Sequence, residues 1–276
     1  MNKWYASFAI GLMACMSLAS CSKEFRQYSQ WSRKGTTSEK DSAAFYFYER
    51  GDYEKASLLF EELQSIYKGE DRARTVLYHY AESKFNYGLY VVAAYYYEQY
   101  SRLYPNDELA SECAFKVAYC YYVESAPHYL DQEYTLKAID QFQLYVNSFP
   151  ETEQAIEAEK LMAELRERLA QKSFEQARTY LRVGNFRAAV TAFDVMIRQF
   201  PDSRYREEAQ FLQFESAAEL AEVSTQAKKR NRYLDALEYY ENFVDRYPNS
   251  AYIKQAEGIY VRTKKNYGKM LAGQNS

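Results

Sequence analysis

The sequence has few of the residues from which catalytic and metal sites are built. It contains only two histidines, His79 and His128, and they lie far apart in the chain, so a histidine-based catalytic or metal centre is not expected. The sequence also lacks a Gly-rich phosphate loop and the motifs Gly-x-Ser-x-Gly, His-Glu-x-x-His and Cys-x-x-Cys. We therefore predict a protein that is not an enzyme and that uses no cofactor and no metal ion.

The sequence also has few cysteines, glycines and prolines, and it has no excess of positive charge. Cys113 and Cys120 lie seven residues apart, which on one helix is about 10.5 Å and too far for a disulfide; we expect both to be small buried residues. The net charge of -3 lacks the basic excess of nucleic-acid-binding proteins. Nine Gly and five Pro beside 30 Tyr favour closely packed helices.

A short apolar segment opens the chain. Lys3 precedes an apolar run over 4–19, which has the charge order and length of a secretory signal and is too short to span a membrane. The run ends Leu18-Ala19-Ser20-Cys21, which resembles the bacterial lipoprotein cleavage box. We predict a lipoprotein signal peptide over residues 1–20 and attachment to the membrane through palmitate and other lipid on Cys21. An ordinary signal peptide with a chance cysteine is the competing interpretation.

The residues after Cys21 predict where the anchor places the protein. Ser22 stands where inner-membrane lipoproteins of enteric bacteria carry Asp, so we expect the outer membrane, with the chain facing the periplasm. Residues 21–35 are polar and without clear period, and we interpret them as a lipidated tether without regular structure.

A repeated unit begins near Thr36. A small residue is followed four positions later by an aromatic residue and twelve positions later by a closing residue that is proline in four of five copies. A glycine opens the uninterrupted copies at Gly51, Gly88 and Gly184. The aligned positions are Ala56, Ala93, Ala138, Ala189 and Ala236; then Phe60, Tyr97, Phe142, Phe193 and Tyr240; then Lys68, Pro105, Pro150, Pro201 and Pro248.

This pattern is typical of tetratricopeptide repeats, in which pairs of antiparallel helices recur about every 34 residues. The closing prolines are 45, 51 and 47 residues apart, so we expect insertions at 124–133 and 222–231 and one long helix over 153–182. A last helix over about 252–267 would cap the array. The predicted fold is an all-α tetratricopeptide-repeat superhelical solenoid of about five helix pairs plus a C-terminal capping helix. Repeats 1–3 occupy 36–150; repeats 4–5 and the cap occupy 151–276.

Two regions narrow the resemblance to a family. The interrupted third repeat around Tyr119 to Phe142 and the long helical stretch from Ala158 to Ser203, taken with the lipoprotein box, resemble the BamD family of the outer-membrane β-barrel assembly machine. Two departures are Lys68-Gly69 in place of a closing proline and the charged insertion at 222–231. The resemblance implies a scaffold whose partners are a BamA-like β-barrel protein, other assembly-machine lipoproteins and unfolded outer-membrane proteins, with no nucleic acid.

The repeat register predicts a binding groove. In tetratricopeptide proteins the first helix of each pair lines the groove, and residues three, four or seven apart share a helix face. The resemblance implies that the N-terminal repeats bind the aromatic-ending signal of unfolded outer-membrane proteins, whereas packing in the core is the competing interpretation of each aromatic residue. The groove residues predicted by the register are Phe45, Tyr48, Glu49, Tyr78, Glu82, Phe85, Asn86, Phe115, Tyr119 and Tyr122, which form an aromatic surface with few charges.

The resemblance implies that the C-terminal half docks on the partner, and we assign this role to Arg178, Arg182 and Arg187 around the fourth-repeat turn. A solvated basic face is the competing interpretation of each. Two other functions remain open at this stage: a tetratricopeptide scaffold for cell-division or peptidoglycan-synthesis enzymes, and a lipoprotein that positions a hydrolase.

Overall fold

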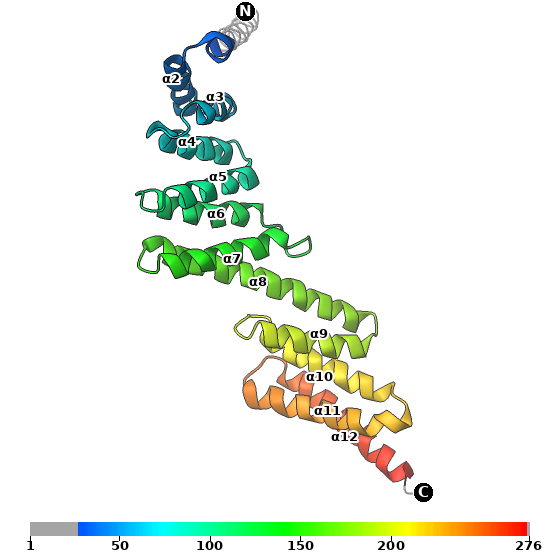
Figure 1. Cartoon of the computed structure of the whole chain (residues 1–276). Helices are drawn as coiled ribbons and strands as arrows, with labels where there is room; N and C mark the ends of the chain where they lie inside the picture. The colour runs from blue at the N-terminus through cyan, green and yellow to red at the C-terminus, as the bar shows by residue number, and fades with distance from the viewer. Residues whose placement is uncertain (1–26, 275–276) are drawn as a thin grey trace, which may run out of the picture. The chain divides into compact units, whose positions relative to one another are not determined.

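The computed structural model describes residues 27–274, so the signal segment and Cys21 lie outside the described residues. Within this range all regular secondary structure is helical, and neighbouring helices run back and forth beside one another (Figure 1). The helices are α2 (Thr37–Glu49), α3 (Tyr53–Ile66), α4 (Arg72–Asn86), α5 (Tyr90–Leu103), α6 (Ala110–Glu124), α7 (Glu133–Ser148), α8 (Glu153–Arg182), α9 (Phe186–Gln199), α10 (Arg206–Glu222), α11 (Gln226–Arg246) and α12 (Ile253–Gln274).

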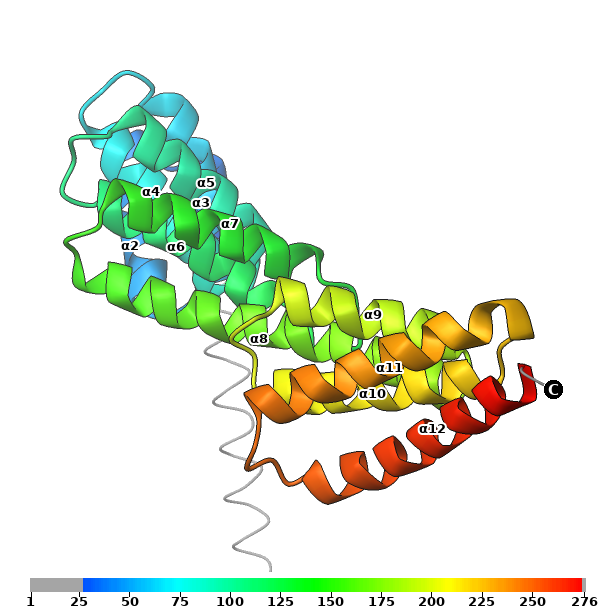
Figure 2. The ribbon, with the colours of Figure 1, turned by 90° about the horizontal axis from the view of Figure 1, so that it is seen from below.

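The described chain forms two compact units. The first comprises residues 27–125 and 134–159, and the second comprises residues 126–133 and 160–274. In the first unit α2 to α6 pack in succession, each against the next. In the second, α9, α10 and α11 pack in succession and α12 contacts both α10 and α11; Figure 2 shows α9, α10, α11 and α12 running alongside one another.

The repeat register is visible in the burial of the side chains. The five aligned alanines are all fully buried, because a small side chain lets the two helices of a pair approach closely. The aromatic residue four positions later is also fully buried in the first four repeats. In the fifth, Tyr240 is only partly buried and Phe243, one turn further along α11, is fully buried. The alanine and aromatic spacing therefore identified the core of each helix pair.

Glycines make the sharp turns between paired helices. Gly88 and Gly184 have φ angles of 88° and 76°, a region that side chains with a Cβ enter only at a cost. Gly69, which directly follows Lys68 at the position of the closing proline of the other repeats, also has a positive φ of 87°. The first repeat thus ends on a left-handed glycine instead of a proline.

The structure confirms the predicted long helix and corrects two other predicted elements. The predicted long helix is confirmed as α8 (Glu153–Arg182). The last helix runs to Gln274, beyond the predicted end near Tyr267. The insertion at 222–231 is mainly helical, because α11 begins at Gln226 and extends the helix backward through the insertion.

The polar stretch before the first repeat is not a loop throughout. Residues 27–34 are helical, although their composition shows no helical period. Tyr28 and Trp31 pack edge-on against the buried Phe47 of α2, with ring centroids 5.8 and 5.9 Å away. These contacts, rather than local propensity, account for the helix.

Among residues 27–274, no helix combines the length and the apolar character that crossing a membrane requires.

Candidate functional site

The predicted groove residues of the first three repeats lie on α2, α4 and α6 of the first unit. We call these the A-helix face: Phe45 and Tyr48 on α2; Tyr78, Glu82, Phe85 and Asn86 on α4; Phe115, Tyr119 and Tyr122 on α6. Its seven aromatic side chains are all half-buried, so each packs on the core and leaves part of its ring exposed. Asn86 is exposed, as is the neighbouring Glu49 of α2, whereas Glu82 is buried.

The α2 end of the face is an aromatic cluster around His79. The imidazole lies 4.8 Å from the ring centroid of Phe45 and 5.0 Å from that of Tyr48, and it stacks on Phe60 at 5.9 Å. Its Nδ1 atom is buried and has no hydrogen-bond partner within the described residues. Burial lowers the pKa of His79, which favours the neutral ring. His79 is therefore a packed side chain in this cluster.

The α6 end of the face is a row of rings. Phe115 and Tyr122 both stack with Tyr119, with ring centroids 6.1 and 5.7 Å away. Phe85 of α4 adjoins the same Tyr119 ring at 6.1 Å. The spacing of three and four residues places Phe115, Tyr119 and Tyr122 on one face of α6. The contact between Phe85 and Tyr119 extends this row of rings to α4 of the preceding repeat.

Between the two aromatic groups lies an ionic network that the sequence-based prediction missed. Lys116 of α6 forms an ion pair with Glu82 of α4 and a second one with Glu112, at 2.8 Å. The hydroxyl of Tyr97 donates a hydrogen bond to Glu82, and that of Tyr78 donates to Glu112. The prediction that this face carries few charges is therefore wrong around Lys116, where three charged side chains meet. The available signal was the 34-residue separation of Glu82 and Lys116, one repeat period.

Burial and pairing set the titration of this network. Burial alone would lower the pKa of Lys116, but its hydrogen bonds to Glu112 and Glu82 outweigh that effect and raise it. Burial alone would raise the pKa of Glu112, but the bond and charge of Lys116 hold it below 4.5. The phenol of Tyr97 has a raised pKa because of burial and the adjacent Glu82 carboxylate. Lys116 is thus charged and both phenols are neutral at physiological pH.

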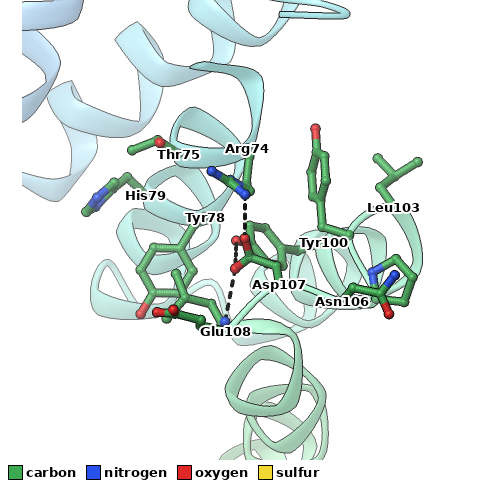
Figure 3. A pocket seen from close by; sticks show the side chains of 12 residues that line it. Arg74, Thr75, Tyr78, His79, Tyr100, Leu103, Asn106, Asp107 and Glu108 are labelled. Atoms are coloured by element: carbon green, nitrogen blue, oxygen red, sulfur yellow. Dashed lines mark hydrogen bonds and ion pairs between the residues drawn. The ribbon is translucent and has the colours of Figure 1, made fainter. Parts of the chain in front are cut away.

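A pocket of about 780 Å³ adjoins the A-helix face where α4 meets the α5–α6 connection. Figure 3 shows Arg74, Tyr78 and His79 on one side and Tyr100 and Asp107 on the other; Glu108 also lines the pocket. Arg74 pairs with Asp107 at 2.8 Å, and Asp107 also accepts hydrogen bonds from the Tyr100 hydroxyl and the Leu109 N–H. The hydrogen bonds from the Tyr100 hydroxyl and the Leu109 N–H lower the pKa of Asp107. The ionised carboxylate of Asp107 therefore joins Arg74, Tyr100 and Leu109 in the wall of this pocket.

The three arginines predicted to dock a partner are all exposed. Arg178 and Arg182 lie one turn apart on α8 and line a pocket together with Glu175 and Glu208; Arg178 pairs with Glu175 at 3.0 Å. Arg187 lies on α9, and it is not among the lining residues of that pocket. The structure therefore brings two of the three together.

The described residues offer little for metal or thiol chemistry. Among residues 27–274 there is no group of three or more His, Cys, Asp or Glu side chains that could hold a metal ion. Cys113 and Cys120 are free and fully buried, as the sequence predicted, and burial raises the pKa of each thiol to about 12.

The paired helices, with a buried alanine in each pair, define an all-α tetratricopeptide-repeat solenoid. A tetratricopeptide-repeat family model matches residues 224–250. A second family model, YfiO, described as an outer membrane lipoprotein, matches residues 37–232. The chain belongs to this family of outer membrane lipoproteins, and the match confirms the resemblance to the BamD family.

A curated relative supports the assignment. The outer membrane protein assembly factor BamD of Rickettsia prowazekii is 29% identical over 158 residues. The alignment covers 55% of this chain and spans 57% of the length of that relative.

Two solved tetratricopeptide structures resemble parts of the chain. The TPR2AB domain of yeast Sti1, in a complex with pHSP90, is 15% identical with a TM-score of 0.36 and covers 83% of this chain and 98% of that one. The TPR domain of P58(IPK) is 11% identical with a TM-score of 0.41 and covers 87% of this chain and 62% of that one.

Proposed function

We propose that the protein is a non-catalytic scaffold lipoprotein for the assembly of outer-membrane β-barrel proteins. In this proposal the lipid on Cys21 holds the chain at the outer membrane, facing the periplasm. The A-helix face binds unfolded outer-membrane proteins. The region of Arg178, Arg182 and Arg187 docks on a BamA-like β-barrel protein, beside the other lipoproteins of the assembly machine. The match to an outer membrane lipoprotein family does not favour the division or peptidoglycan alternative.

The observation that carries the proposal is the row of half-exposed rings on α4 and α6. The rings of Phe85, Phe115 and Tyr122 each contact the ring of Tyr119, with centroids 5.7 to 6.1 Å apart, yet none of the four is fully buried. Rings that are fixed by their neighbours lose little conformational entropy when they bind, and this makes them effective anchors for an extended peptide with aromatic side chains. Such a surface would recognise segments of an unfolded β-barrel client.

One ring on each of the three helices can be removed to test whether the A-helix face binds the client. Replacing Tyr48, Phe85 and Tyr119 by Ala removes an anchor from each of the three helices, and we expect binding of a peptide with an aromatic C-terminus to weaken at least ~10-fold. Fluorescence anisotropy titration measures the affinity, and circular dichroism checks that the helix content is intact.

A triple Ala variant of three exposed tyrosines outside the face is the matched control. Tyr87, Tyr95 and Tyr129 are 48%, 56% and 71% exposed, and their removal should leave the affinity within ~2-fold. Equal affinities for the wild type and the A-helix face variant would refute the assignment of this face as the client site.

A further inference from the structure

Two segments of the second unit carry positive charge without any acidic residue. Between Ser224 and Leu234 the cations are Lys228, Lys229, Arg230 and Arg232, and from Gly258 to the end of the sequence they are Arg262, Lys264, Lys265 and Lys269. The whole chain has a net charge of -3, so this concentration is a local departure from an otherwise acidic composition. Local charge of one sign produces a potential that attracts an oppositely charged partner.

The fold brings the two segments together. The start of α11 and the last turns of α12 lie on the same side of the second unit (Figures 1 and 2). Tyr233 of α11 and Tyr267 of α12 have ring centroids 5.7 Å apart. Asn266 of α12 donates a hydrogen bond of 2.7 Å to Glu222 at the end of α10. We call this surface the α11–α12 basic patch.

Several of its cations are free to meet a partner. Lys228, Arg230, Lys265 and Lys269 are exposed, and no carboxylate among residues 27–274 forms an ion pair with them. Two carboxylates of α10 beside the patch are engaged: Glu219 pairs with Arg262, and Glu222 accepts the bond from Asn266. The positive potential of the patch is therefore only partly neutralised.

The patch is hollow at its centre. A pocket of about 650 Å³ lies between the start of α11 and the end of α12, and its lining includes Lys229, Lys269, Gln226, Asn266 and Tyr233, together with Glu222, whose carboxylate accepts the hydrogen bond from Asn266. Lysine ammonium groups bind carboxylates, and the side-chain amides of Gln and Asn can bond both to a carboxylate and to a peptide backbone. Burial, with the nearby Glu222 carboxylate, raises the pKa of Tyr233 to about 12, so this hydroxyl remains a neutral donor.

The shape and charge together indicate one class of occupant. A planar bilayer surface would contact the exposed lysines but would not enter the pocket between two helices. A polypeptide segment rich in Glu and Asp can place one side chain in the pocket and others against Lys228, Arg230 and Lys265. We propose that the α11–α12 basic patch docks an acidic polypeptide segment of a partner protein.

This surface is separate from the sites already assigned. The A-helix face belongs to the first unit, and the pocket of Arg178 and Arg182 is lined by residues of α8 and α10 other than these. The match to the outer membrane lipoprotein family ends at residue 232, so α12 and most of α11 lie beyond it. Binding at the α11–α12 basic patch can therefore be tested independently of client binding at the A-helix face.

The test uses two variants of the full chain with the same change in net charge. In the patch variant, Lys228→Glu, Arg230→Glu and Lys265→Glu reverse three exposed cations. In the control variant, Arg102→Glu, Arg166→Glu and Lys254→Glu reverse three exposed cations on α5, α8 and α12. The probe is a fluorescent peptide of about twelve residues in which Glu alternates with Ser, titrated at low and at physiological salt.

We expect the patch variant to bind the acidic peptide at least ~10-fold more weakly than the wild type and the control variant to bind within ~3-fold of it, since close charge pairs dominate over distant ones. Equal weakening in both variants would show that only net charge matters and would overturn the proposal. A second titration uses vesicles with phosphatidylglycerol. Loss of vesicle binding in the patch variant, with peptide affinity unchanged, would assign the patch to the membrane surface and would also overturn it.

Discussion

At the scale of single residues, Lys116 contacts two carboxylates and two aromatic rings beside the A-helix face. Its ammonium group lies between the carboxylates of Glu82 and Glu112 and above the rings of Tyr78 and Tyr97, 5.5 Å from each centroid. The Lys116 side chain is 23% exposed and that of Glu82 is 11% exposed. Water therefore cannot easily replace either partner if the other is removed.

Replacing Lys116 by Met should destabilise the protein by about 3 kcal/mol, because Glu82 is left as a buried charge without its cation. The double variant Glu82→Gln with Lys116→Met removes both charges, and we expect it to recover most of that loss. Urea unfolding measures both. A double variant as unstable as the single one would show that the packing of the lysine stem, and not the buried charge, causes the effect.

The same network should respond to acid. The folded-state pKa of Glu112 lies below 4.5, held there by Lys116 against the opposing effect of burial. The ionised Glu112 therefore contributes stability that is present above about pH 4.5 and is lost as the pH falls through the lower, folded-state pKa. In Lys116→Met this part of the acid dependence should become shallower.

Gly184 and Gly258 differ in backbone conformation but not in the space around them, so substituting each by Ala measures the free-energy cost of a positive φ angle. A Cβ added to Gly184 or to Gly258 would meet no atom within 4 Å, so neither substitution causes a steric clash. Gly184 has a φ of 76°, whereas Gly258 lies within α12. We expect Gly184→Ala to destabilise the protein by about 1 to 2 kcal/mol and Gly258→Ala to stabilise it by up to about 1 kcal/mol, as measured by thermal unfolding. The same sign for both would contradict this account.

At the scale of elements, the α6–α7 connection is an ordered loop. The two N–H bonds of the buried Gln132 amide are shared among the carbonyls of Ala126, Pro127, Leu130 and Asp131, whose oxygens lie 2.9 to 3.4 Å from Nε2. Arg168 and Lys172 of α8 donate to the carbonyls of Ala126 and Leu130. One side chain thus replaces the backbone bonds that a helix or strand would supply.

Gln132→Leu should loosen this loop, because four carbonyls lose their common donor. We expect hydrogen exchange of residues 126–132 to accelerate by at least ~10-fold, with little change in α4 and α5. Gln154→Leu changes an exposed glutamine of α8 and is the control. Unchanged protection of the loop in Gln132→Leu would mean that the contacts from α8 are sufficient to hold it.

The elements also show which parts of the structure could be inferred from the sequence. The alanine register and the full extent of α8 were predictable, because helical period and proline punctuation are local signals. The ionic network around Lys116 was not, because it depends on which side chains of successive repeats meet. The helix at 27–34 was missed because the contacts of Tyr28 and Trp31 with Phe47, and not a local period, account for it. The helical start of α11 was missed because an insertion does not have to be a loop.

At the scale of the whole molecule, α8 contributes residues to both compact units. Its residues up to 159 belong to the first unit and those from 160 to the second. A helix is cooperative along its length, so we expect thermal unfolding to occur in one transition. Ala163→Pro, at an exposed position of α8, should cost about 3 kcal/mol and separate the transition into two. Ala163→Ser is the control, and two transitions in the wild type would refute the coupling.

The scarcity of histidine has a practical consequence. With only two imidazoles in the chain, the histidine ring protons should give few and separable signals in a proton NMR spectrum. His79 lies among the rings of Phe45, Tyr48, Phe60 and Tyr78, whose ring currents would displace its signals strongly. His128 lies beside one ring, that of Tyr129. The protein therefore carries a native spectroscopic probe at the α2 end of its A-helix face and an internal reference elsewhere.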